Sequence, residues 1–493
     1  MSKEYLDVLI VGAGLSGVGA ACHLAKACPT KSFAILEGRE RMGGTWDLFR
    51  YPGIRSDSDM YTLGYNFKPW TNPKAIADGP SILSYIKETA KENNIDKHIR
   101  YGQKVKSANW SRKDALWTVL IEEQHTGKKK EITCNFFLSC AGYYSYESGF
   151  QPDFKGKNEF KGELIHPQAW PENFDYSDKK VVVIGSGATA VTIVPAMTDK
   201  AKHVTMLQRS PTYMMSLPEK DESLNKLREY LPEKWVYRFA RTRNVALAIG
   251  TFQFSRRFPE KTKEFLLGQV KQQLGPNVDM KHFTPSYNPW DERLCAVTNG
   301  DLFKAIRNNK ASIVTDHVKK FTETGIELQS GETLDADVII TATGLNVQML
   351  GGIDIFVENK KFDITEKMLY KGVLIEDLPN LGLVFGYTNA SWTLKSDLVS
   401  EFVCRLINKM DQVGMRQCIA QNYNAKVHHT SFLDMQSGYI QRAMDKVPQQ
   451  GSRMPWKLYQ NYAFDMAMLR LGKLDDRVVR FSSPGLNERL VTA

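Results

Sequence analysis

The chain has 493 residues, of which 42% are hydrophobic and 24% are charged. This is the composition of an ordinary globular enzyme, and the length allows two or three domains. The formal net charge of +10 would suit an anionic cofactor, an anionic membrane surface or a nucleic acid. The net charge is the only feature that would indicate nucleic-acid binding, and it is a weak one. We therefore expect no nucleic-acid partner. The sequence contains no run of eighteen apolar residues, which excludes a membrane-spanning helix.

The seven cysteines are scattered, with no CxxC pair and no metal-ligand spacing. We therefore expect no metal site, and a reducing, cytoplasmic compartment fits best. The short apolar run Leu6–Val11 ends at a glycine turn, so it is interpreted as a strand and not as a signal peptide.

A complete nucleotide-binding unit opens the chain. Strand Asp7–Val11 runs into Gly12-Ala-Gly14-Leu-Ser16-Gly17, a helix is predicted over 18–26, and strand 31–36 ends on Glu37. In such a unit the glycines allow a tight turn and a close approach to a pyrophosphate, and the acid binds ribose hydroxyls. The predicted cofactor-binding residues here are Gly12, Gly14, Ser16, Gly17 and Glu37.

A second glycine pair follows at Gly43-Gly44-Thr45-Trp46, and then comes the stretch Arg50–Asp57. In flavoproteins with such a fold, this region commonly lies near the flavin. We expect Gly44, Thr45, Trp46, Arg55, Ser56, Asp57 and Val105 to contact the cofactor. Asp57 could hold a cationic side chain in place. Its alternative interpretation is a turn or helix cap within Ser56–Asp59.

A second fingerprint, Gly185-Ser-Gly187-Ala-Thr189-Ala190, follows the apolar strand Lys180–Ile184. The next strand, His203–Leu207, ends in Gln208-Arg209-Ser210 and not in an acid. An acid would repel a 2′-phosphate, whereas an arginine and a hydroxyl would bind it. The second fold therefore favours NADP through Gly185, Ser186, Gly187, Ala188, Thr189, Ala190, Val191, Arg209 and Ser210.

Residues 218–285 break the pattern, with charged helices predicted over 219–231 and 261–274. The segment 235–258 between them mixes apolar and basic residues and contains no acid. It could be a helical lid or an ordinary packed insertion. A peripheral contact with an anionic membrane surface stays open as a third alternative.

Two apolar strands end in similar small-residue turns, Leu138–Gly142 and Asp337–Gly344. Two such crossings are expected if one nucleotide domain is inserted into the other. We predict an α/β fold of two Rossmann-like dinucleotide-binding domains, for FAD and NADPH, the second inserted into the first, with a helical insertion. The expected parts are 1–145 (FAD domain), 146–217 (linker and NADPH domain), 218–285 (helical insertion), 286–343 (NADPH domain) and 344–493 (FAD domain).

Between the fingerprints lies Phe160-Lys-Gly162-Glu-Leu-Ile-His166-Pro-Gln-Ala-Trp170-Pro171. It fits FxGxxxHxxxW followed by Pro, and residues 43–57 fit GGxWxxxxYPGxxxD. With these motifs the chain resembles the type I Baeyer–Villiger monooxygenases, which are class B flavoprotein monooxygenases. The segments around Gly43–Gly53 and Tyr387–Lys395 resemble a mycobacterial prodrug-activating subgroup in particular.

The resemblance implies bound FAD and NADPH, and O₂ with a ketone or thioether as substrates. It implies oxygen insertion beside a ketone carbonyl through a C4a-peroxyflavin, giving an ester. Arg293 matches the active-site arginine, Asp57 the aspartate that orients it, and Trp392 lies in a segment that can meet the cofactor. Many members of the family have a lysine where this chain has Glu292. Without that lysine, we expect the 2′-phosphate of NADPH to be bound less strongly.

Two alternatives remain: N- or S-oxygenation without ester formation, and an NADPH oxidase or reductase. Trp170 argues against the first and the missing CxxC against the second. A histidine in a loop is more often structural than catalytic. Phe160, Gly162, His166 and Trp170 are therefore interpreted as a hinge that couples NADPH occupancy to domain position.

Overall fold

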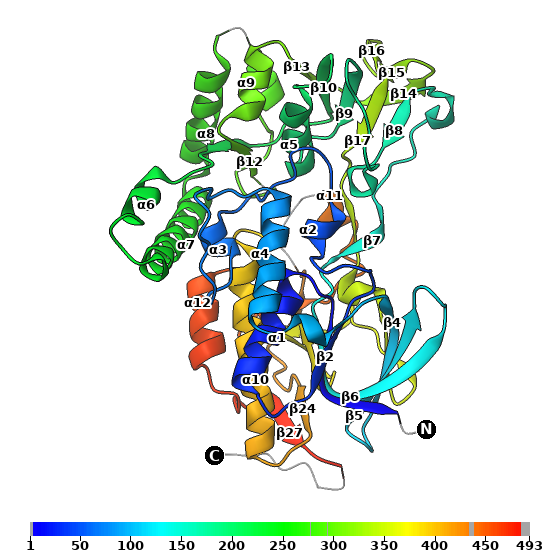
Figure 1. Ribbon diagram of the computed structural model, residues 1–493, viewed down its shortest axis with the longest axis vertical. Helices are drawn as coiled ribbons and strands as arrows, with labels where there is room; N and C mark the ends of the chain where they lie inside the picture. Colours follow the sequence, from blue (N-terminus) through cyan, green and yellow to red (C-terminus); the bar gives the residue numbers. More distant parts are fainter. Residues whose placement is uncertain (1–2, 277, 293, 433–437, 485–493) are drawn as a thin grey trace.

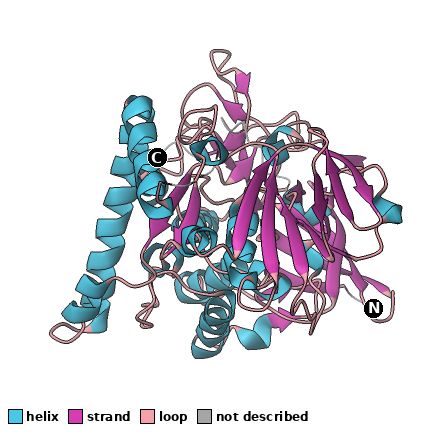
Figure 2. Cartoon of the chain, turned by 90° about the horizontal axis from the view of Figure 1, so that it is seen from above, coloured by secondary structure: helices cyan, strands magenta, loops and turns pink. Residues whose placement is uncertain are grey.

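The computed structural model describes residues 3–276, 278–292, 294–432 and 438–484. Two sheets occupy separate halves of the molecule (Figure 1). Seen from above, the strands gather on one side and many of the helices lie along the other (Figure 2).

The first sheet has eleven strands from two distant parts of the chain. Its strands are β1 (Glu4–Val11), β2 (Phe33–Leu36), β3 (Ile99–Arg100), β4 (Gln103–Ser111), β5 (Leu116–Glu123), β6 (Lys129–Ser139), β19 (Asp354–Val357), β20 (Lys360–Lys361), β21 (Leu369–Tyr370), β22 (Leu374–Ile375) and β23 (Leu381–Leu383). The pairs β1–β2, β1–β6, β2–β3 and β6–β23 are parallel. The pairs β4–β5 and β5–β6 are antiparallel. Strand β6 therefore joins the antiparallel strands to the parallel ones.

Helices cover this sheet because its parallel strands are apolar on both faces. Helix α1 (Leu15–Ala27) packs against α10 (Trp392–Gln412), and α4 (Gly79–Glu92) lies beside α1. Helix α4 begins directly after Asp78, whose carboxylate accepts a hydrogen bond from the Ser81 N–H at 2.9 Å.

The second sheet has five parallel strands in the order β13-β10-β9-β17-β8. They are β8 (Glu163–Ile165), β9 (Lys180–Ile184), β10 (His203–Gln208), β13 (Ala311–Thr315) and β17 (Val338–Thr341), with helices α5 (Ala188–Met197) and α9 (Asp301–Arg307). In the sequence, every strand of this sheet comes after β6 and before β19 of the first sheet. The predicted insertion of one Rossmann-like fold into the other is therefore confirmed.

A helical insertion leaves the second fold between β11 (Met214–Leu217) and β12 (Cys295–Thr298). It contains α6 (Glu222–Leu227), α7 (Glu233–Arg257) and α8 (Pro259–Leu274). Helix α6 is shorter than the predicted 219–231. It starts after Asp221, whose carboxylate accepts from the Leu224 N–H at 3.1 Å, and Pro232 then caps α7.

The remaining elements are short. They are α2 (Thr45–Leu48), α3 (Met60–Leu63), α11 (Gly438–Gln441), α12 (Tyr462–Met466), β7 (Tyr144–Gly149), β14 (Val318–Thr322), β15 (Gly325–Leu328), β16 (Thr333–Asp335), β18 (Leu345–Val347), β24 (Gln417–Ala420), β25 (His429–Thr430), β26 (Gln450–Gly451), β27 (Val479–Ser482), η1 (Asp96–His98), η2 (Lys157–Glu159), η3 (Pro167–Ala169), η4 (Met280–Phe283), η5 (Met349–Gly352) and η6 (Ala467–Leu471). Within the described ranges, no helix is both long and apolar enough to cross a lipid bilayer.

Candidate functional site

A cavity of about 490 Å³ opens at the carboxyl ends of β1 and β2, where ligands bind in folds of this kind. Segments far apart in the sequence line it, from the first fingerprint to the start of α10. The predicted residues that line it are Gly12, Gly14, Ser16, Glu37, Gly44, Thr45, Trp46, Ser56, Asp57, Val105 and Trp392. The first fingerprint, the second glycine pair and the start of α10 thus meet at this cavity.

Glu37 directly follows β2, and its carboxylate is buried. It accepts hydrogen bonds from the Ala13 N–H at 2.8 Å and from the Arg39 N–H at 2.9 Å. Burial raises its pKa above the usual range, and the two backbone donors oppose that shift. Gly17 stands behind the cavity, where an added Cβ would lie 1.8 Å from the Gly12 carbonyl oxygen. The glycine is required for the close contact between helix and turn.

The cavity also has walls that the motifs did not identify. Arg39, Lys104, Tyr144, Tyr146 and Gln348 all line it. The Arg39 guanidinium pairs with Asp47 at 2.8 Å and lies 5.8 Å from the centre of the Tyr146 ring. Tyr144 and Tyr146 belong to β7, directly after the turn that the sequence had singled out. Side chains two residues apart on a strand point to the same face, so the sequence could have indicated that Tyr144 and Tyr146 line one wall.

Trp392 closes the cavity from the C-terminal part of the chain. Its indole N–H donates to the Ser16 hydroxyl at 2.8 Å, and its ring stacks on Tyr143 with centroids 5.2 Å apart. The preceding Ser391 hydroxyl is hydrogen-bonded to the Thr62 hydroxyl at 2.6 Å. Trp392 is therefore held by both α1 and α3.

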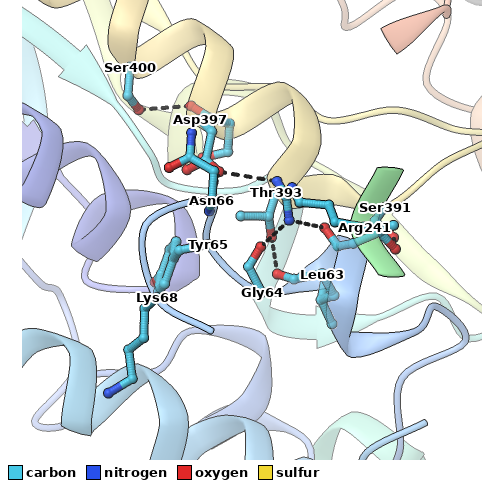
Figure 3. A network of polar contacts seen from close by, with 12 residues as sticks. Leu63, Gly64, Tyr65, Asn66, Lys68, Arg241, Ser391, Thr393, Asp397 and Ser400 are labelled. Carbon is cyan, nitrogen blue, oxygen red and sulfur yellow. Dashed lines mark hydrogen bonds and ion pairs between the residues drawn. The ribbon is translucent and has the colours of Figure 1, made fainter. Parts of the chain in front are cut away.

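An arginine of the helical insertion, with a side chain that is 11% exposed, supports the same region (Figure 3). Arg241 of α7 donates to the carbonyl oxygens of Tyr61 at 2.9 Å and Gly64 at 2.8 Å, and it pairs with Asp397 of α10 at 3.4 Å. The Asp397 carboxylate also accepts from the Asn66 N–H at 2.9 Å. Helix α7 is thereby fixed to α3, which holds Ser391, and to α10, which begins at Trp392.

Asp57 and Arg55 lie in the same loop but in different surroundings. Asp57 is exposed and faces the cavity, and the cap of α3 is Asp59, which accepts from the Thr62 N–H at 3.0 Å. Capping therefore does not occupy Asp57. Arg55 instead forms an ion pair with Asp301 of α9 at 2.5 Å, across the two folds. Arg293, the predicted partner of Asp57, lies outside the described residues.

The second fingerprint lies between β9 and α5, and Ala188, Thr189, Ala190 and Val191 form the first turn of that helix. The Ser186 hydroxyl donates to the Ser210 carbonyl oxygen at 3.1 Å, which brings Gly185–Gly187 next to the end of β10. Arg209 is exposed there. Burial raises the pKa of the nearby Glu292 carboxyl, and Arg209 partly opposes this shift. An exposed cation is thus available beside a helix N-terminus.

The two chain crossings between the folds run side by side. Strands β7 and β18 are antiparallel, and the Phe150 N–H donates to the Gly344 carbonyl oxygen at 2.9 Å. The His166 ring lies against Gly149, where an added Cβ would stand 1.9 Å from Cε1, and Nε2 is 3.2 Å from the same Gly344 oxygen. His166 therefore contacts both crossings.

The other linker residues pack within the second fold. Phe160 meets Phe321 edge-on, with centroids 6.4 Å apart, and Gly162 lies against the Asp337 backbone. Trp170 meets Phe174 at 6.0 Å in the hydrophobic cluster that also contains Tyr51. They anchor the linker, whereas His166 reaches the crossings.

Comparison with known proteins agrees with this geometry. The flavin-binding monooxygenase-like family profile matches residues 72–448, and an NAD(P)-binding Rossmann-like domain profile matches residues 10–71. The chain is 53% identical over 481 residues to the FAD-containing monooxygenase EthA of Mycobacterium tuberculosis (strain ATCC 25618 / H37Rv), covering 97% of this chain and 98% of that protein. It is 49% identical over 481 residues to the probable FAD-binding monooxygenase AlmA of Acinetobacter baylyi, covering 97% and 96%.

Among solved structures, the fold is similar to that of an oxidized steroid monooxygenase bound to NADP. The TM-score is 0.76 at 20% identity, and the match covers 97% of this chain and 100% of the other. The resemblance inferred from the motifs is confirmed at the level of the family. The chain belongs to the flavin-binding monooxygenase-like family.

Proposed function

We propose that the protein is an FAD-containing monooxygenase that uses NADPH and O₂ to convert a ketone into an ester. The observation that carries this proposal is the cavity that joins the first fingerprint and Glu37 to Trp46, Asp57 and Trp392. The second fingerprint, with Arg209 and Ser210, lies in the neighbouring fold. The two nucleotide sites therefore differ in charge at the position that meets the ribose.

The residues of the cavity fit FAD. The buried Glu37 carboxylate can accept hydrogen bonds from ribose hydroxyls, and the backbone at the start of α1 offers N–H groups to the pyrophosphate. Thr45, Trp46, Tyr144 and Trp392 would bound the flavin ring. A cavity of about 490 Å³ is of the size that cofactor sites have.

The second fold fits NADPH better than NADH. Its ribose-facing strand end carries the exposed Arg209 and no carboxylate of its own, so a 2′-phosphate would meet a cation. The nearby Glu292 opposes this attraction. Because NADPH and NADH differ only in the 2′-phosphate, Arg209 would discriminate between them through its contact with that phosphate.

Bound FAD supplies the redox chemistry and the activation of O₂. The chain contributes binding, orientation and exclusion of water. Trp392 and Tyr143 cover the cavity with stacked rings. From the family resemblance, Arg293 would stabilise negative charge that develops on the ketone oxygen, and Asp57 would orient Arg293.

Oxygenation of a thioether or thioamide is the closest alternative, since the same site could transfer oxygen to a sulfur atom. A reductase with a redox disulfide is disfavoured, because Cys140 is the one cysteine among the described residues that lines the cavity. An NADPH oxidase would release hydrogen peroxide without any organic product.

Product analysis tests the proposal. The purified yellow protein is given NADPH, ¹⁸O₂, a panel of linear and aryl ketones, and a thioether. We expect an ester that carries one labelled oxygen, with the other in water. Sulfoxide without ester would replace the proposal by the alternative, and peroxide alone would identify an oxidase. Reactions without NADPH are the control.

A further inference from the structure

Exposed apolar side chains are concentrated on the helical insertion. Half of the large hydrophobic residues that are exposed in the described part of the chain lie between 230 and 265. On α7 they are Trp235, Phe239, Leu247 and Phe254, with exposed fractions from 50% to 62%. Phe265 on α8 adjoins them, as do Tyr230, Leu231 and Phe258 in the turns before and after α7. Such a concentration marks an interaction surface.

The structure fixes which face of α7 points outward. Val236, Tyr237 and Ala240 are buried, and Arg241 is tied to α3 and α10 (Figure 3). With 3.6 residues per turn, the four exposed side chains of α7 fall within an arc of about 120°, and the side chains of Tyr237, Arg241 and Ser255 lie on the opposite side of the helix. Rotation of the helix to bury them would break the Arg241 contacts.

This face is also positively charged. Positions 234–259 contain six basic residues and no acidic residue. Arg243 and Arg256 pair with Asp221 and Asp291, but no described carboxylate lies within ion-pair distance of Lys234, Arg238, Arg257 or Lys261. Arg238 lies 5.8 Å from the centre of the Trp235 ring, and Lys261 lies 5.4 Å from that of Phe258. Cations and aromatic rings therefore alternate across the face.

We propose that this aromatic–basic face docks the protein onto an anionic lipid bilayer. The face is formed by Trp235, Phe239, Leu247, Phe254, Phe258, Arg238, Arg257 and Lys261. Helix α7 lies in the plane of the membrane surface. Its aromatic rings reach the boundary between headgroups and acyl chains, and its cations contact lipid phosphates. A second copy of the chain is a poorer occupant. A two-fold contact would bring the same uncompensated cations together.

Vesicle sedimentation with the FAD-loaded protein tests this. Vesicles of phosphatidylcholine with phosphatidylglycerol should bind the protein at least about tenfold more strongly than phosphatidylcholine alone, and salt should weaken binding. The charge variant Arg238→Glu/Arg257→Glu and the apolar variant Trp235→Ser/Phe239→Ser should each lose at least about tenfold in partition.

Controls place comparable changes elsewhere on the surface: Lys113→Glu/Lys128→Glu reverses two other cations and Tyr101→Ser removes another exposed ring. Both should bind like the wild type. Trp235→Phe should still bind but lose the blue shift of tryptophan emission that wild type shows with vesicles. Bound FAD reports that each variant is folded. The proposal is overturned by equal binding to both vesicle types or by full binding of the two face variants. It is also overturned if Trp235→Ser/Phe239→Ser splits a dimer while no protein binds vesicles.

Discussion

The two nucleotide folds share one backbone plan and differ in the side chain that ends their second strand. In the first, β1, α1 and β2 lead to Glu37, which is buried and holds two backbone N–H groups. In the second, β9, α5 and β10 lead to Arg209, which is exposed. The backbone therefore provides phosphate binding in both, and one side chain decides which ribose is accepted.

The folds also differ in enclosure. Trp392, Val105 and Tyr146, from three distant parts of the chain, wall the first cavity. At the second, Arg209 and Ser210 face solvent. This difference suits a cofactor that stays bound in the first fold and one that is exchanged in the second.

Replacing Arg293 should have the largest effect, because it separates binding from chemistry. Arg293→Ala should lower ester formation about 100- to 1000-fold, the range for loss of one charge-stabilising group. NADPH should still bleach the flavin. Arg293→Lys, which keeps the charge, is the matched control. Ester formation at the wild-type rate in Arg293→Ala would remove its assigned role.

Glu37→Gln should break the first site selectively. The amide would point its NH₂ at one of the two backbone donors and lose the charged acceptor for ribose, so FAD should bind about 100-fold more weakly. Flavin absorbance after gel filtration measures this. Glu40→Gln, an exposed neighbour, should retain FAD. If Glu37→Gln keeps a full complement of FAD, Glu37 is structural only.

Arg209→Ala should alter the second site selectively. Loss of a hydrogen-bonded charge should raise the KM for NADPH about 10- to 100-fold and leave that for NADH nearly unchanged. Lys202→Ala, an exposed cation of the same fold, should change neither. An equal rise for both nucleotides would mean that Arg209 does not read the 2′-phosphate.

His166→Ala should disturb the communication between the folds. Its ring contacts both chain crossings, so we expect a several-fold loss of ester formation and more hydrogen peroxide per NADPH, with FAD retained. Activity and peroxide assays measure the two effects. Loss of FAD from this variant would contradict the hinge role.

A smaller effect concerns pH. Burial lowers the pKa of the His166 imidazole, and Nδ1 accepts from the Gln168 N–H at 3.2 Å. Below about pH 6.5 the unfolded chain binds this proton more readily than the folded chain, so stability falls as pH drops. The Tm of the wild type should therefore fall more steeply between about pH 7 and 5 than that of His166→Ala. Parallel curves would show that His166 is not the group responsible.

The sequence predicted the parts that obey local rules. Strand, glycine turn, helix and charged strand end are adjacent in the chain, so both fingerprints and the insertion of one fold into the other could be inferred. Gln348 could not be assigned to the cavity, because only the pairing of β7 with β18 brings it beside Tyr143. Arg55 was expected at the cofactor, yet its partner is Asp301, which lies 246 residues further along the chain. Contacts of that sequence separation leave no local pattern.

The most direct measurement is anaerobic reduction of the protein-bound flavin, followed by loss of its absorbance, with NADPH and with NADH. The difference between the two folds predicts rapid bleaching by NADPH, saturating at a concentration at least about tenfold lower than that for NADH. Equal saturation by the two nucleotides, or no bleaching by either, would contradict the division between a flavin-holding first fold and an NADPH-reading second fold.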